Sequence, residues 1–148
     1  MLNFFSAVVC AIVVAFIFAV APAVAETRPV QIALVDPVQI FNAGTSISGV
    51  RLNLIYGRND SVTGVESGLI GVVDSDFTGW QYNFAGNITK GNFSGLQMGF
   101  VNYANSAKGL QLGVVNYAVS LKGLQIGVIN IIVQGGMFPV FPLINWSF

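Results

Sequence analysis

Histidine is absent from this chain, and much of enzyme chemistry is excluded with it. The 148 residues contain no histidine and one cysteine, Cys10. The commonest general base, the histidine-containing triads and most zinc sites are therefore unavailable. Cys10 lies inside an N-terminal apolar run, so residues 26–148 offer neither thiol chemistry nor an internal disulfide. We expect no enzyme activity, no catalytic residues and no cofactor.

Charge is also scarce. Charged residues make up 8% of the chain against 54% hydrophobic residues, and the formal net charge is zero. Nucleic acid is excluded as a partner because the chain has no basic patch, and disorder is excluded because disordered segments have the opposite composition. Asp74 and Asp76 could contribute to a calcium site, but two carboxylates fall short of the six to eight oxygens needed. We expect no metal site, and no small-molecule substrate can be identified.

The first 25 residues have the pattern of an export signal. An apolar run from Phe4 to Val20 is followed by Ala23-Val24-Ala25, the small-x-small form at which signal peptidase cleaves. This predicts a signal peptide at 1–25 and a single mature β-repeat domain at 26–148. The segment Met1-Leu2-Asn3 lacks Lys and Arg. An uncleaved anchor therefore stays open as the alternative, since about 20 apolar residues can span a bilayer.

Tandem repetition dominates the rest of the chain. Three units recur at a spacing of 14: Gly95-Leu-Gln-Met-Gly-Phe-Val-Asn102, Gly109-Leu-Gln-Leu-Gly-Val-Val-Asn116 and Gly123-Leu-Gln-Ile-Gly-Val-Ile-Asn130. Weaker units begin at Gly49, Gly64 and Gly79, at spacings of 14 to 16, and Val30 to Asp36 is a further echo. A fixed period of this kind indicates a repeat architecture.

Each repeat predicts a strand. Apolar residues alternate with others near period two, and Asn, Asp, Ser and Gly fill the intervals. In a late repeat, Leu110, Leu112 and Val114 fall on one face, while Gln111, Gly113 and Val115 fall on the other. We therefore expect an all-β sheet with one apolar face and one mixed face of polar and small residues.

These units resemble the bacterial surface repeat-containing proteins, exported chains built from tandem Gly-Leu-Gln-x-Gly-Leu-Val-Asn units. The resemblance covers nearly all of residues 26–148 and is strongest from Arg51 to the ending Pro139-Val-Phe-Pro-Leu-Ile-Asn-Trp-Ser-Phe148. It implies a location at the cell surface or outer membrane and brings no established activity. The units at Gly64 and Gly79 depart from the pattern, with Asn83 where a glycine is usual.

Two architectures fit the repeats, and we favour a small antiparallel β-barrel of the outer-membrane type. The Val30 segment, the glycine-led units and Val140 to Phe148 give about eight short strands, and eight is the smallest common barrel. Ile144, Trp146 and Phe148 alternate as in the assembly signal of such barrels. From Phe77 onward the only charges are Lys90, Lys108 and Lys122, too few for a water-soluble surface of this size.

The alternative is a parallel β-solenoid with one repeat per coil. It would stack Gln97, Gln111 and Gln125 as an amide ladder and place Arg51 over Glu66. Uniform 14-residue units also do not readily generate the stagger that barrel closure needs.

The predicted function is that of a non-enzymatic structural repeat protein in the outer membrane or at the cell surface of a Gram-negative bacterium. Its predicted partners are membrane lipid and the outer-membrane assembly machinery. The solenoid alternative predicts a surface-exposed interaction module instead.

Overall fold

The computed structural model describes residues 26–148, and the regular elements in this range are strands. They are β1 (Thr27–Val35), β2 (Val38–Gln39), β3 (Ser46–Asn59), β4 (Val62–Val73), β5 (Phe77–Gln134) and β6 (Val140–Ser147). The 58 residues of β5 wind through several coils without leaving strand geometry. The predicted signal peptide at 1–25, with Cys10, lies outside the described residues.

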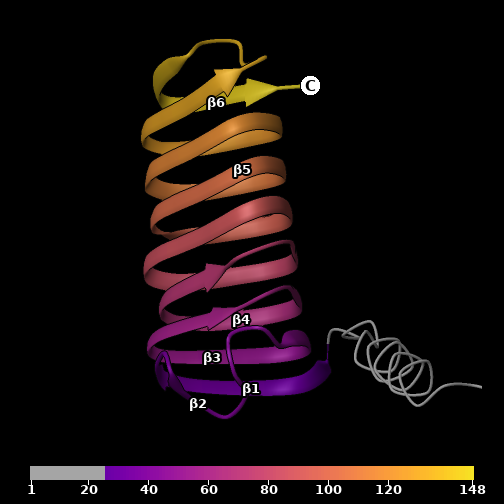
Figure 1. Cartoon of the computed structure of the whole chain (residues 1–148). Coiled ribbons are helices and arrows are strands. Elements are labelled where there is room, and N and C mark those ends of the chain that lie inside the picture. Colours follow the sequence, from indigo (N-terminus) through magenta and orange to yellow (C-terminus); the bar gives the residue numbers. More distant parts are fainter. Residues whose placement is uncertain (1–25) are drawn as a thin grey trace, which may run out of the picture.

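The strands form a stack of coils. One sheet has the order β2-β1-β3-β4-β5-β6, and the pairs β1 with β3, β3 with β4 and β4 with β5 are parallel. Each coil returns the chain to its starting side one strand spacing further along the axis. The result is a parallel β-solenoid, which rises from β1 and β2 at one end to β6 at the other (Figure 1).

The expectation of an all-β fold is confirmed, but the antiparallel barrel of about eight short strands is wrong. Equivalent residues of successive repeats lie directly beside each other: Gly49 pairs with Gly64, and Gly64 with Gly79. Repeats of nearly equal length bring the chain back without stagger, and a barrel cannot close without stagger between its strands. Parallel stacking instead gives the strands inside the stack a neighbour on each side.

The first glycine of each repeat stands where neighbouring coils approach most closely. The φ angles of Gly49, Gly64, Gly79, Gly95, Gly109 and Gly123 lie between 129° and 147°. A Cβ atom on Gly109 would lie 2.1 Å from the carbonyl oxygen of Gly95. Glycine is therefore required both by the backbone angle and by contact with the next coil.

The apolar core follows one column of the repeat. The residue two positions before each first glycine is buried, and these residues are Ile47, Val62, Phe77, Phe93, Ala107 and Leu121. Phe77 and Phe93 stack with ring centroids 5.8 Å apart. The same buried cluster also contains Val73, Ala104, Ala118 and Ile132. The column fills only part of the interior, and polar side chains fill the rest.

The C-terminal strand covers the last coil. β6 pairs antiparallel with the end of β5, with Leu124 beside Trp146 and Ile126 beside Ile144. Phe148 is 90% exposed, and β6 does not meet the first strand. The interpretation of Ile144, Trp146 and Phe148 as a barrel-closing assembly signal is therefore wrong. Their alternation reflects one outward face of a terminal strand, a pattern that both architectures share.

Candidate functional site

One polar ladder runs through the interior along the glutamine column. The amide Nε2 atoms of Gln97, Gln111 and Gln125 donate to the Oε1 atom of the preceding coil's glutamine at 2.8, 2.7 and 2.8 Å. The ladder begins at Gln81, and all four side chains are fully buried. The solenoid alternative predicted this ladder for Gln97, Gln111 and Gln125, and the hydrogen bonds confirm it.

A second ladder, of asparagines, was missed by the sequence analysis. Asn87 donates to Asn102, Asn102 to Asn116 and Asn116 to Asn130, each at 2.8 Å. The same amides also donate to backbone carbonyls of the next coil, such as that of Leu112. The asparagine that ends each regular unit was the sequence signal for this ladder. Asparagine is unfavourable inside a strand unless its side chain has hydrogen-bond partners.

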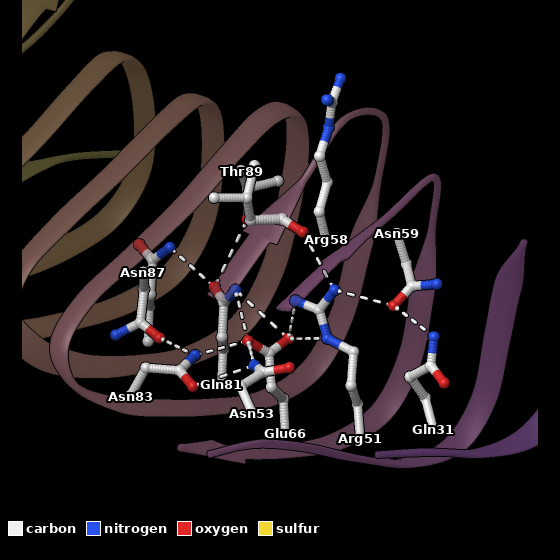
Figure 2. A network of polar contacts seen from close by, with 12 residues as sticks. Gln31, Arg51, Asn53, Arg58, Asn59, Glu66, Gln81, Asn83, Asn87 and Thr89 are labelled. Carbon is white, nitrogen blue, oxygen red and sulfur yellow. Dashed lines mark hydrogen bonds and ion pairs between the residues drawn. The ribbon is translucent and has the colours of Figure 1, made fainter. Parts of the chain in front are cut away.

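The N-terminal end of the glutamine column holds a buried ion pair (Figure 2). The Nε and Nη2 atoms of Arg51 lie 3.0 and 2.6 Å from Oε2 of Glu66, and both side chains are 0% exposed. The other oxygen of Glu66 accepts hydrogen bonds from Asn53 and Asn83. Arg51 also donates to the carbonyl oxygen of Val72 at 3.0 Å. The solenoid alternative placed Arg51 over Glu66, and the pairing of these residues confirms it.

Asn83 shows why one irregular repeat departs from the pattern. Its position normally carries a glycine, but here the side chain points inward and donates to both Glu66 and Asn87. It therefore links the ion pair to the asparagine ladder (Figure 2). Asparagine at this position therefore supplies a hydrogen bond to the buried carboxylate of Glu66, which glycine could not.

These interior groups hold the coils in register and offer no access to a reactant. Glu66 is fully buried, and its carboxylate is enclosed by protein donors. Within residues 26–148, no group of three or more His, Cys, Asp or Glu side chains could hold a metal ion. Asp74 and Asp76 do not share a site, since Asp74 pairs with Arg58 and Lys90 while Asp76 accepts from Asn92.

Asp74 provides a pH-dependent contact on the surface. Burial by itself would raise its pKa, but hydrogen bonds from Lys90 and Arg58, together with their positive charges, outweigh burial and lower the pKa below its ordinary value. A lowered folded-state pKa adds stability above the unfolded-state pKa, and this stability is lost as the pH falls through the folded-state pKa.

We therefore predict that Asp74→Asn lowers the free energy of unfolding by less than about 1 kcal/mol at neutral pH. In strong acid, where Asp74 is protonated in both states, parent and variant should unfold at the same urea concentration. Urea unfolding at the two pH values measures the difference. If Asp74→Asn loses the same unfolding free energy at neutral pH and in strong acid, the carboxylate charge does not stabilise the fold.

The outward face of the first strand segment in each coil is an apolar wall. We define the apolar wall as the first, third and fifth residues after each repeat's first glycine: Val50, Leu52, Leu54, Val65, Ser67, Leu69, Trp80, Tyr82, Phe84, Leu96, Met98, Phe100, Leu110, Leu112, Val114, Leu124, Ile126 and Val128. It contains no charge, and Ser67 alone is neither aliphatic nor aromatic. Trp80, Phe84 and Phe100 are 50%, 68% and 55% exposed.

The predicted faces are largely confirmed. Leu110, Leu112 and Val114 share the outward apolar face, while Gln111 points into the interior. Val115, which the sequence places on the mixed face with Gln111, is half-buried like Val114, whereas Gln111 is fully buried. The strand pairing shifts register at this point of the coil, between Asn53 and Tyr56 and between Gly68 and Ile70. The chain turns there, so the alternation of period two is interrupted.

The wall is not flat along its length. An open hollow of about 310 Å³ lies over the middle coils, lined by Tyr82, Phe84, Met98, Phe100, Leu112 and Val114 with the backbone of two glycines. Its lining combines the rings of Tyr82, Phe84 and Phe100 with the smaller side chains of Leu112 and Val114. The exposed surface therefore combines projecting rings with an apolar depression.

Comparisons of the chain with protein-family models, curated proteins and solved structures returned no match. Among residues 26–148, no helix has the length and apolar character needed to cross a membrane.

Proposed function

We propose that this protein is a non-enzymatic surface interaction module, a β-solenoid that binds a partner through its apolar wall. The observation that carries the proposal is the absence of charge from a face that spans the stack of coils and whose side chains are exposed or half-buried. The polar side chains that would make such a face soluble are turned inward, where Gln97, Gln111 and Gln125 pair with one another.

The size of the wall supports a binding role. A half-exposed aromatic side chain leaves on the order of 100 Å² in contact with water. Four aromatic side chains of the wall are 43% to 68% exposed: Trp80, Tyr82, Phe84 and Phe100. Their combined exposed area alone is as large as the largest apolar patch expected on a monomeric protein, roughly 300–600 Å². The neighbouring aliphatic side chains extend the patch well beyond that size. A surface of this kind marks a site that is covered in the functional state.

The proposed location of the module rests on the sequence alone. The predicted signal peptide at 1–25 and the resemblance to bacterial surface repeat proteins support export to the outer membrane or cell surface of a Gram-negative bacterium. The expected partnership with the outer-membrane assembly machinery was argued from barrel closure by Phe148, and the proposed function does not rest on it.

Cysteine labelling tests whether the wall is covered in the cell. In a Cys10→Ser chain, Val65→Cys places a thiol on the wall, where Val65 is 47% exposed. Thr63→Cys is the matched control, an exposed residue of the same coil on the other side of Gly64. We expect maleimide labelling in intact envelopes, relative to the urea-unfolded chain, to be at least several-fold lower at Val65→Cys than at Thr63→Cys. Equal labelling at the two positions would show that the wall is bare and that the proposed function is wrong.

A further inference from the structure

We propose that the partner of the apolar wall is a lipid bilayer, which the solenoid enters along one long edge. This inference rests on the proposed function and specifies the chemistry of the partner. The edge is the corner at which each coil turns from its first strand segment into its second. The residues at this corner decide between a fluid partner and a folded one.

The corner consists of two successive apolar residues in every coil, and we call it the apolar edge. Its pairs are Leu34-Val35, Leu54-Ile55, Leu69-Ile70, Phe84-Ala85, Phe100-Val101, Val114-Val115 and Val128-Ile129. Leu54 and Ile55 are 61% and 49% exposed, and Val128 and Ile129 are 60% and 43% exposed, whereas Val114 and Val115 are half-buried. Turning segments at a protein surface are ordinarily built from Gly, Pro, Asn, Asp and Ser. An apolar corner repeated through the whole stack is therefore unusual for a surface in water.

Next to the edge, the surface on its far side also carries apolar side chains in the C-terminal half of the stack. Val101 is followed by Tyr103, and Tyr103 stacks on Tyr117 of the next coil with ring centroids 5.3 Å apart. Ile129 is followed by Ile131 and the 51% exposed Val133. Two apolar faces thus meet at a convex edge. A folded partner with one flat face would cover only one of them, whereas acyl chains flow around both.

The backbone of the edge suits a shallow, interfacial position rather than the hydrocarbon centre of a bilayer. β5 keeps strand geometry through each corner from Phe77 to Gln134. The pairing between coils shifts register at the corner, as between Gly68 and Ile70 and between Gly127 and Asn130. Unsatisfied backbone groups are the main barrier to placing β-structure in lipid. The amide side chains of the glutamine and asparagine ladders are paired within the interior and do not face the edge.

The charges are placed on the other parts of the coil. Asp60, Asp74, Asp76, Lys90, Lys108 and Lys122 lie where the chain passes from one repeat to the next. Next to the edge itself, the charged residues are Asp36 and Arg58, both at the N-terminal end of the stack. This distribution resembles that of an amphipathic helix that lies in the interface and buries its apolar side about 5–10 Å deep. We expect the edge from Phe84 to Ile129 to be the inserted part.

A fluorophore at the edge tests this inference in the full chain. In a Cys10→Ser background, Phe100→Cys carries an environment-sensitive label at a residue that is 55% exposed. Asn105→Cys is the control, an exposed residue farther along the same coil. The labelled proteins are mixed with phosphatidylcholine–phosphatidylglycerol vesicles with and without nitroxide-labelled lipid. We expect a blue-shifted emission and several-fold stronger nitroxide quenching at position 100 than at position 105.

Each other outcome overturns the lipid inference in a recognisable way. Equal quenching at positions 100 and 105 would mean that the chain binds vesicles without using the edge. No quenching at either position would mean that lipid does not cover the edge, even where residues 1–25 carry the chain to the vesicle. A blue shift at position 100 that grows with protein concentration and needs no vesicles would identify a second copy as the partner. If Val65→Cys is nevertheless protected in envelopes, the proposed function stands and only the lipid partner is wrong.

Discussion

Arg51→Gln is expected to lower the free energy of unfolding by about 3–5 kcal/mol, because it leaves the carboxylate of Glu66 buried without its positive partner. Both side chains are 0% exposed, so water cannot replace the lost interaction. Glu66→Gln is expected to lower the free energy of unfolding by a similar amount, because it leaves the guanidinium of Arg51 buried without its negative partner. Urea unfolding followed by circular dichroism measures both losses.

The double variant Arg51→Gln/Glu66→Gln provides the control. It would extend the glutamine ladder, which begins at Gln81, through two further coils, since Arg51, Glu66 and Gln81 stand in register. Replacing both charged partners removes the unpaired charge, and we expect the double variant to recover at least half of the loss seen in either single variant. If the double variant instead loses the sum of the two single-variant losses in unfolding free energy, the two side chains act independently and the ion pair does not couple the coils.

Gly109→Ala is expected to lower the free energy of unfolding by about 3 kcal/mol or more, or to prevent folding altogether. A methyl group has no space at this position. The φ angle of Gly109 is 129°, and the new Cβ atom would lie 2.1 Å from the carbonyl oxygen of Gly95. Relief would require two coils to move apart, which would stretch the Gln97 to Gln111 hydrogen bond of 2.7 Å. Thermal and urea unfolding measure the loss.

Gly86→Ala is the matched control for this substitution. A Cβ atom on Gly86 would meet only the carbonyl oxygen of Val101, at an ordinary contact distance of 3.8 Å, and its φ angle is not in the positive range. We expect a change in unfolding free energy within about 1 kcal/mol. Equal losses in the two variants would show that close contact between coils does not explain the repeated glycine.

The sequence could not decide between barrel and solenoid because its strongest patterns are common to both. Outward apolar residues such as Leu110 and Leu112, with an inward Gln111, satisfy a strand in either architecture. The scarcity of charge and the alternation of Ile144 and Trp146 are equally shared. The equal repeat length and the complementary charges of Arg51 and Glu66 favoured the solenoid, since only parallel stacking brings these two side chains together without stagger.

The apolar edge was also beyond the reach of the sequence. Alternation of side chains between the two faces of a strand assigns Val115 to the face opposite Val114. Nothing in the residue types marks the point where the strand turns. The corner arises from a register shift between coils, as between Gly68 and Ile70. That shift is set by how successive coils stack, so it became visible only in the folded chain.

The sequence by itself determined that this protein is an all-β repeat, that histidine- and thiol-based chemistry is excluded from residues 26–148, and that one strand face is apolar. These properties depend on residue types and on spacing along the chain, which are local quantities. Tertiary structure alone decided that the coils stack in parallel, that Asn87, Asn102, Asn116 and Asn130 form a second ladder, and that two apolar faces meet at an edge. These properties depend on which segments become neighbours, and hydrogen bonding between coils fixes that choice.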